Sequence, residues 1–376
     1  MTLFCSQVRT GSFKFILTST RSNSYSFSPS RPPRFYSYPS TAKTMSTMKK
    51  SPPPAAAVPR PSSSVVLLSP TNQVLLLKRV QTSSSFASAH VFPGGNLDAK
   101  HDGEVGDPGD LERYHRDCAA YRMAAVRETF EETGMLLAFK GDVGNNKEVL
   151  RVDEEVRERG RRDVHSGAEG FGQFVERLGG RADVDGLIPF TRWITPPNMK
   201  KRFTTQMYVY MMPFEAEAAG TVEGGTVVVP THDGGLEHTE LAFNDVGVWL
   251  EQAKKGEVTL YPPQFYILSV LEPFFAGGKG TVNEQRERFL EFVDRVPTAE
   301  GGKETEMIPW KDKAMSPTVV GRKEDGRLIM GLDKPGPELE GTGRGGDGQR
   351  RIVVRFGKEG PSEVSIEIKG EKKANL

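Results

Sequence analysis

Residues 127–134 read RETFEETG and place three glutamates and one arginine within six positions, directly before a glycine. On a helix, residues four apart share a face, so Glu128 and Glu132 project together while Arg127 can pair with Glu131. Two adjacent carboxylates repel each other at neutral pH unless a divalent cation lies between them. Carboxylate oxygens suit Mg²⁺ or Mn²⁺, and no His or Cys stands at zinc spacing in this stretch. The spacing predicts a metal site, and the alternative is a solvated, charged helix face.

The segments that flank these acids indicate how they would be held. Asp110 can N-cap a helix over 111–133, and Gly134 provides the left-handed stop after its last turn. Upstream, VFPGGNLD ends a strand in a glycine turn, where the carbonyl of Gly95 can approach a cation because no side chain blocks it. Downstream, MLLAF predicts a further strand. These neighbours favour the metal site over the solvated face.

The stretch RETFEETGM, with Gly95 upstream, resembles the Nudix box, a loop-helix-loop signature of hydrolases that cleave nucleoside diphosphates linked to another moiety. The first half departs from the usual spacing, because 31 residues separate Gly95 from Arg127 and Ala119 stands where the family has its first glutamate. An insertion of this kind, and blocks such as SFASAHVFPGGNLD and LIPFTRWITPPNMKKRF, resemble the Nudix type 19 group of peroxisomal and mitochondrial coenzyme A diphosphatases. The resemblance covers about residues 62–275. RFTTQMYV departs from the group, which has an acid after RF and a double aromatic.

The resemblance implies a set of ligands and an orienting residue. Glu128 and Glu132 would bind Mg²⁺ or Mn²⁺, Glu131 would be a third ligand or a partner, and the Gly95 carbonyl would complete the sphere. Arg127 would orient Glu131 and not touch the substrate.

A general base is expected from a loop after the box. Glu237 in GGLEHTE is the first candidate and Glu240 the second, and the alternative is that both are ordinary loop acids. His238, between them, is expected to be a surface residue.

The implied reaction is hydrolysis of a pyrophosphate bond in coenzyme A or acyl-coenzyme A, giving 4′-phosphopantetheine or its acyl form and adenosine 3′,5′-bisphosphate. Arg79 and Phe92 fall in the remnants of a coenzyme A signature. Arg202 and Arg192 could bind phosphate, and Trp193 could either stack on adenine or be a core residue of a strand. The alternative substrates are NADH, ADP-ribose or a capped RNA end. A catalytically silent scaffold that binds a nucleotide or a protein is the alternative function.

The composition limits the partners. Residues 1–97 carry eleven Lys and Arg and no acid, which leaves 39 basic and 49 acidic residues for the rest of the chain. An acidic body is a poor DNA or general nucleic-acid binder, because such proteins need a basic surface. No apolar run reaches the roughly 18 residues of a membrane span. We therefore expect a small nucleotide as the partner.

The resemblance implies the Nudix fold, an α/β (α+β) sandwich with a mixed β-sheet between helices. We expect a transit-like segment and linker over 1–63, the Nudix domain over 64–280 with an exposed helical insertion at about 141–186, and a C-terminal extension with short strands over 281–376. The Ser- and Arg-rich start predicts a mitochondrial location. The C-terminal Ala374-Asn375-Leu376 resembles a peroxisomal signal and offers the alternative.

Overall fold

The computed structural model describes residues 56–81, 88–141, 148–214, 238–277, 280–298, 307–358 and 360–369. All of them fall within one unit, Pro54–Leu376. The predicted transit segment up to residue 55, Glu237 and the tripeptide 374–376 lie outside the described residues. The stretch TVVVP at 226–230, whose composition predicts a strand, also lies outside them.

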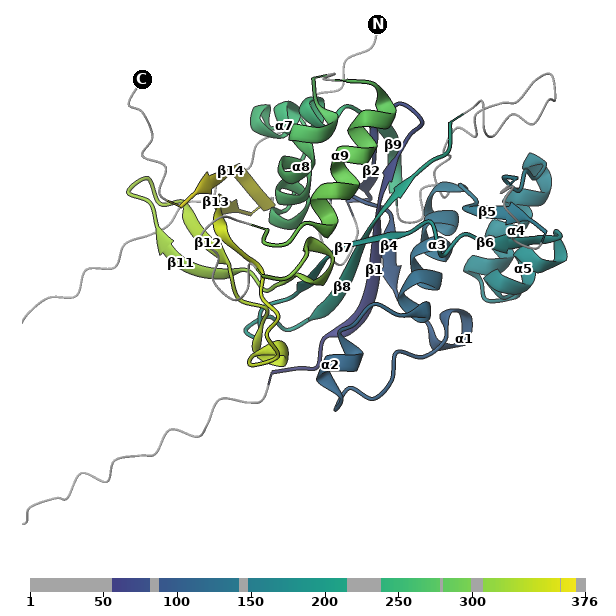
Figure 1. Cartoon of the computed structure of the whole chain (residues 1–376), viewed down its shortest axis with the longest axis horizontal. Coiled ribbons are helices and arrows are strands. Elements are labelled where there is room, and N and C mark those ends of the chain that lie inside the picture. The colour runs from purple at the N-terminus through teal and green to yellow at the C-terminus, as the bar shows by residue number, and fades with distance from the viewer. Residues whose placement is uncertain are drawn as a thin grey trace, which may run out of the picture. The chain divides into compact units, whose positions relative to one another are not determined.

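A mixed sheet forms the centre of this unit, and its strands come from both ends of the described chain (Figure 1). The strands follow the order β10-β7-β8-β1-β2-β3, with β4 paired to β1 and β9 paired to β2. β1 runs parallel to β8 and antiparallel to β2 and β4. The bounds of these strands are β1 Arg60–Leu68, β2 Val74–Arg79, β3 His90–Val91, β4 Gly94–Asn96, β7 Ile188–Ile194, β8 Phe203–Met211, β9 His238–Asn244 and β10 Ala314–Met315.

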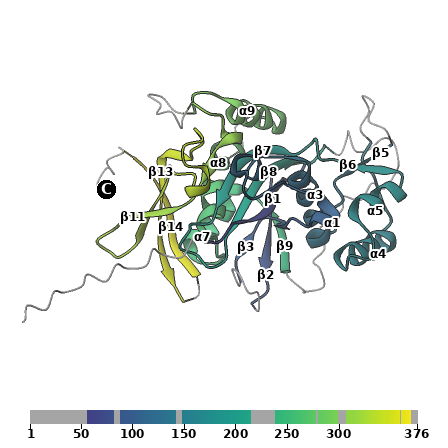
Figure 2. The same cartoon turned by 90° about the horizontal axis from the view of Figure 1, so that it is seen from below.

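The central strand β1 is apolar on both faces. Val65 and Leu67 belong to the core on the side of helix α3, whereas Val66 and Leu68 belong to the core on the side of helix α8. Because side chains alternate along a strand, this unbroken apolar run indicates a strand covered on both faces. Figure 1 and Figure 2 show this arrangement, with α7, α8 and α9 on one face and α3 on the other.

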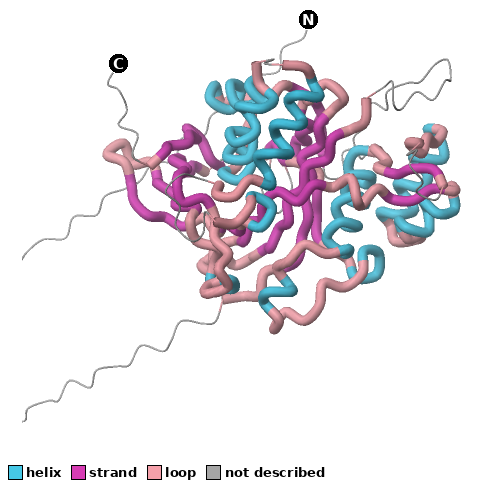
Figure 3. The backbone as a smooth tube through the Cα atoms, viewed as in Figure 1, coloured by secondary structure: helices cyan, strands magenta, loops and turns pink. Residues whose placement is uncertain are grey.

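Helices cover both faces, as the tube in Figure 3 shows. α8 is apolar around most of its surface, since it packs against α7, α9 and the strands β13 and β14. The helical elements are α1 Ala99–Asp102, α2 Leu111–Tyr114, α3 Ala119–Thr133, α4 Glu154–His165, α5 Phe171–Arg177, α7 Val246–Lys255, α8 Pro262–Phe275, α9 Val282–Asp294, η2 Trp310–Asp312 and η3 Pro337–Leu339.

Two smaller sheets complete the described fold. The hairpin pair β5 Ala138–Lys140 and β6 Gly180–Ala182 encloses α4 and α5, and this is the predicted helical insertion. An antiparallel sheet has the order β11-β12-β13-β14, with bounds Thr318–Arg322, Leu328–Leu332, Asp347–Gly357 and Gly360–Ile368.

Two predictions differ from the structure. β1 begins at Arg60, inside the predicted linker, because residues 60–63 pair with β8 and residues 62–64 pair with β4. The C-terminal extension has the predicted short strands, in the sheet β11-β12-β13-β14, and it also contributes to the central fold, since β10 pairs with β7 and Trp310 is buried in the central core. The single helix predicted over 111–133 is two helices, with Asp110 capping α2 and Cys118 preceding α3.

One predicted element has the wrong type. The sequence ELAFNDVGVWLEQAKKG has the pattern of a helix, but its first five residues, 240–244, form most of β9. Pairing with β2 determines the strand conformation, with Leu77 opposite Leu241 and Leu75 opposite Phe243. The helix α7 begins only at Val246.

Candidate active site

Helix α3 carries the acidic turn and is fixed from behind by its apolar face. Tyr121, Ala125, Val126 and Phe130 are fully buried in the core between α3 and the sheet. The helix ends where predicted, because Gly134 adopts the left-handed conformation with φ 70° and donates its N–H to the carbonyl of Phe130 at 2.8 Å. The same helix also contacts β4, which pairs with β1 in the central sheet.

Two carboxylates of α3 meet the glycine strand β4. The N–H of Gly94 donates to Oε2 of Glu132 at 2.8 Å. A Cβ atom built on Gly95 would lie 2.4 Å from Cδ of Glu128 and 2.5 Å from both of its oxygens. Real Cβ atoms essentially never come this close to another heavy atom, so a side chain at position 95 would require Glu128 to move. The two acids expected to bind metal therefore converge on one glycine turn.

The buried side chain of Arg127 contacts several groups around the acidic turn. Its Nε and Nη2 form a bidentate pair with the Asp102 carboxylate, both at 2.8 Å. Its Nη1 lies 2.9 Å from Glu131 and 3.0 Å from Glu128, and Nη2 also donates to the Asn96 carbonyl at 3.1 Å. The four-apart contact predicted between Arg127 and Glu131 is thus present.

The charge balance around Arg127 follows from these contacts. Burial alone would lower the pKa of Arg127, but hydrogen bonds to Asp102 and the charge of Glu128 raise it above its usual value. Burial raises the pKa of Glu128 to about 7, although Arg127 opposes the shift. A cation beside Glu128 would favour its ionised form.

Glu131 is already engaged on both sides. Besides Arg127, its carboxylate contacts Nδ1 of His165 at 3.0 Å, and its backbone carbonyl accepts from Nε of Arg161 at 2.6 Å. Both of these partners come from α4 in the insertion. These contacts favour the alternative in which Glu131 is a partner of Arg127 and does not bind the metal.

Glu132 has a second neighbour that contradicts an expectation. Nε2 of His238, at the start of β9, lies 3.6 Å from Oε1 of Glu132. His238 is fully buried, so the prediction of a surface histidine is wrong. On β9, His238 lies opposite Arg79 of the neighbouring strand β2.

The structure describes only one of the two candidates for the general base. Glu237 lies outside the described residues. Glu240 is exposed on β9, where its carboxylate pairs with Nζ of Lys78 at 3.0 Å.

The residues fit a cation held by two carboxylates better than one held by three. Within the described part of the chain, no three His, Cys, Asp or Glu side chains are grouped closely enough to hold a metal. Glu128 and Glu132, however, both face β4, at Gly95 and Gly94 respectively. Carboxylate and carbonyl oxygens are the donor set that Mg²⁺ or Mn²⁺ prefers.

The residues predicted to bind substrate do not gather at one place. Arg79 lies opposite His238 and so near the acidic turn. Phe92 and Trp193 belong to the core on the α8 side of the sheet. Trp193 is in edge contact with the ring of Tyr266 and donates its indole N–H to Thr191, which matches its alternative assignment as a core residue.

Arg202 is also held away from the acidic turn. It pairs with Glu338 at 2.5 Å and donates to the carbonyls of Ala57 and Thr195 at 2.7 and 3.0 Å. These partners hold its side chain at the Phe203 end of β8.

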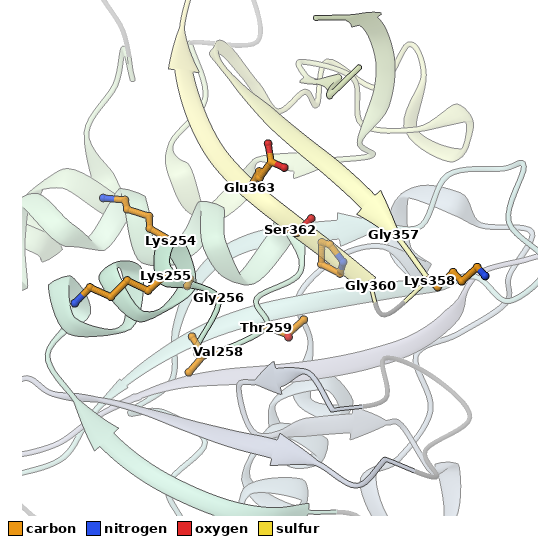
Figure 4. A pocket seen from close by; sticks show the side chains of 12 residues that line it. Lys254, Lys255, Gly256, Val258, Thr259, Gly357, Lys358, Gly360, Ser362 and Glu363 are labelled. Atoms are coloured by element: carbon orange, nitrogen blue, oxygen red, sulfur yellow. The ribbon is translucent and has the colours of Figure 1, made fainter. Parts of the chain in front are cut away.

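A pocket of about 550 Å³ lies between the end of α7 and the β13–β14 hairpin (Figure 4). Lys254, Lys255 and Lys358 are among its lining residues, and Figure 4 shows the two helix lysines pointing away from the hairpin. No residue of the acidic turn lines this pocket.

Three contacts of the site could not be read from the sequence. Asp102, Arg161 and His165 reach the acidic turn from segments 25 to 34 positions away. A single Asp, Arg or His in a charged stretch of sequence does not indicate that its side chain will contact the acidic turn.

Comparisons with known proteins connect this geometry with one family. Residues 110–271 match the family model described as the NUDT19 Nudix domain. A protein of Caenorhabditis elegans named nudix hydrolase 7 is 30% identical over 203 residues, which are 54% of this chain and 56% of the relative. The acyl-coenzyme A diphosphatase NUDT19 of Xenopus laevis is 25% identical over 238 residues, covering 53% of this chain and 59% of the relative.

The chain thus spans less than two thirds of the length of these relatives. A solved structure of a NUDIX hydrolase from Alicyclobacillus acidocaldarius aligns with a TM-score of 0.44 and 18% identity, over 56% of this chain and 90% of that chain. Among the described residues, no helix is both long and apolar enough to cross a membrane.

Proposed function

We propose that this chain, whose residues 110–271 match the NUDT19 Nudix domain, hydrolyses a pyrophosphate bond in a nucleoside diphosphate-linked substrate with the help of a divalent cation. The observation that carries the proposal is the convergence of Glu128 and Glu132 on the glycine turn of β4. A solvated charged face would not need a glycine to admit its carboxylate.

Glu128, Glu132 and the Gly95 carbonyl would hold the cation. Mg²⁺ or Mn²⁺ bound there would neutralise pyrophosphate oxygens and acidify a bound water. The chain's own contribution is to hold both carboxylates aimed at one point. The N–H of Gly94 restrains Glu132, while Arg127 restrains Glu128 and is itself fixed by Asp102.

The proton from the attacking water would pass to a carboxylate near the cation. Glu237 remains the first candidate because it directly precedes His238, which lies 3.6 Å from Glu132. Glu240 is the second candidate, and its pair with Lys78 would have to open for it to act. A pH-rate profile of Glu237→Gln that loses its acidic limb would support the first assignment. An unchanged profile would move the role to Glu240 or to the acidic turn itself.

The substrate that we propose is coenzyme A or acyl-coenzyme A, with adenosine 3′,5′-bisphosphate and 4′-phosphopantetheine or its acyl form as products. Two relatives, from Xenopus laevis and Gallus gallus, are named acyl-coenzyme A diphosphatase NUDT19, which supports this choice. Arg79 lies on the strand next to His238 and is the candidate for contact with a substrate phosphate.

One assay tests both the proposed pyrophosphate hydrolysis and the proposed coenzyme A substrate. The purified chain is incubated with Mg²⁺ or Mn²⁺ and a panel of coenzyme A, acyl-coenzyme A, NADH, ADP-ribose and capped RNA, with products separated by chromatography. Cleavage of the coenzyme A substrates supports the full proposal. Cleavage of another member alone supports the chemistry and rejects the substrate. No cleavage of any member indicates a silent scaffold.

A further inference from the structure

Arg192, on β7, is a fully buried guanidinium with unsatisfied donors. Its Nη1 donates to Oγ1 of Thr204 at 3.0 Å, and the group lies 4.4 Å from the ring centre of Tyr121. Its Nε and Nη2 have no hydrogen-bond partner. None of the described carboxylates lies within ion-pair distance of it. An unpaired buried charge of this kind is costly, so a missing partner is indicated.

Three further donors face the same region. Nδ1 of His115 contacts Thr204 Oγ1 at 2.8 Å, while its Nε2 has no partner. Arg344 donates through Nη1 to the His115 carbonyl at 2.6 Å, and Nη2 of Arg202 is buried without a partner. Burial, and then the charges of Arg192, Arg344 and Arg202, lower the pKa of His115 to about 3. The field at this cluster is therefore positive.

One acid belongs to this cluster, because Glu338 pairs with Arg202 at 2.5 Å. Asp312 contacts Arg344 through its backbone, where its carbonyl accepts from Nε at 3.0 Å. Neither carboxylate reaches Arg192. Burial, followed by the charge of Arg192, lowers the pKa of Arg344 to about 10, which indicates that the two guanidiniums repel each other. An anion between them would remove this repulsion.

The cluster is separate from the proposed metal site. Gly95, Ser63, Gln206 and Arg192 lie in one row across β4, β1, β8 and β7. Three strand spacings separate the first from the last, or roughly 14 Å between Cα atoms. Ser63, which donates to the Tyr121 carbonyl at 2.6 Å, and Gln206 are both buried and lie between the two sites in this row.

We propose that Arg192, His115, Arg202 and Arg344 form a second binding site, for a phosphate-type oxyanion. Guanidinium groups bind such anions through paired, charge-assisted hydrogen bonds, and the free nitrogens supply them. Arg344 lies on the glycine-rich loop 341–346 and is the partly exposed member of the set. An anion would reach the buried nitrogens from the side of this loop. The source is either free phosphate or a phosphate group of a nucleotide.

The test is a titration of the full chain in EDTA, so that no metal-assisted binding occurs, at constant ionic strength set with chloride. Inorganic phosphate and adenosine 3′,5′-bisphosphate are titrated separately, by calorimetry and by the shift in melting temperature. Saturable binding of phosphate assigns the site to the free anion. Binding of the bisphosphate alone assigns it to a nucleotide phosphate. Both results support the proposal.

Variants assign the binding to this cluster. Arg344→Gln is expected to weaken the affinity roughly tenfold or more, since it removes a charge-assisted bond. Arg192→Gln is expected to abolish it, and if that variant fails to fold, Arg344→Gln carries the test. The exposed neighbour Arg116, which pairs with Glu112, provides the matched control Arg116→Gln, with unchanged affinity expected. Glu132→Gln should also bind normally. Equal affinity in Arg344→Gln and the wild type, or no saturable binding up to about 10 mM, would overturn the proposal.

Discussion

The carboxylate of Glu128 occupies the space that a side chain would need at Gly95. The Cδ atom of Glu128 lies 2.4 Å from where a Cβ atom of residue 95 would be. This relationship connects the acidic helix to the glycine strand more specifically than the spacing of either motif does.

Gly95→Ala is therefore expected to displace Glu128 and to reduce the turnover by about 100-fold, in line with the loss of correct ligand orientation at a metal site. The measurement is kcat at saturating metal, with circular dichroism to show that the fold persists. Gly172→Ala is the matched control, because nothing lies within 4 Å of its Cβ position on α5. Equal losses in both variants would contradict the account.

Asp102 is expected to matter for stability as well as for the site. Its side chain is fully buried and forms a bidentate pair with Arg127. Asp102→Ala leaves that arginine buried without its strongest partner, which should cost about 3–5 kcal/mol in the free energy of unfolding. Urea denaturation measures the loss.

The control for this loss is an exposed pair. Asp185, which lies 3.4 Å from Arg181, is exposed, and Asp185→Ala should cost less than about 1 kcal/mol. If Asp102→Ala lowered the free energy of unfolding as little as Asp185→Ala does, the buried pair of Asp102 and Arg127 would contribute little to stability.

The sequence predicted the parts of this site that follow local rules. The four-apart pair of Arg127 and Glu131 and the stop at Gly134 depend only on helix geometry and on glycine's access to positive φ. The buried position of His238 could not be predicted in this way. It depends on β9 pairing with β2 across more than 150 positions, and the same pairing converts a stretch expected to be helical into a strand.

His115 gives the protein a dependence on pH. Its pKa in the folded state is about 3, below the ordinary value near 6.5, because of burial and then the neighbouring arginines. The unfolded chain therefore binds a proton that the folded chain does not. The resulting stability is complete above about pH 6.5 and falls as the pH decreases toward 3.

In chloride buffer without phosphate, the wild type should lose about 2–3 kcal/mol through His115 between pH 7 and pH 4.5. His115→Gln should lose correspondingly less over the same range, by urea denaturation at each pH. Parallel curves for the two proteins would show that His115 is not the group responsible.

The central claim is that Glu128 and Glu132 hold a catalytic cation, and Glu132→Gln tests it most directly. The variant preserves the size of the side chain and an oxygen for the Gly94 N–H, but removes the charge. Its activity toward coenzyme A is measured against the wild type over a range of Mg²⁺ and Mn²⁺ concentrations, with Glu155→Gln on the exposed face of α4 as control. We expect the fold to persist and the rate to fall by about 100-fold or more at every metal concentration. A folded Glu132→Gln that keeps more than about a tenth of the wild-type rate would contradict the assignment.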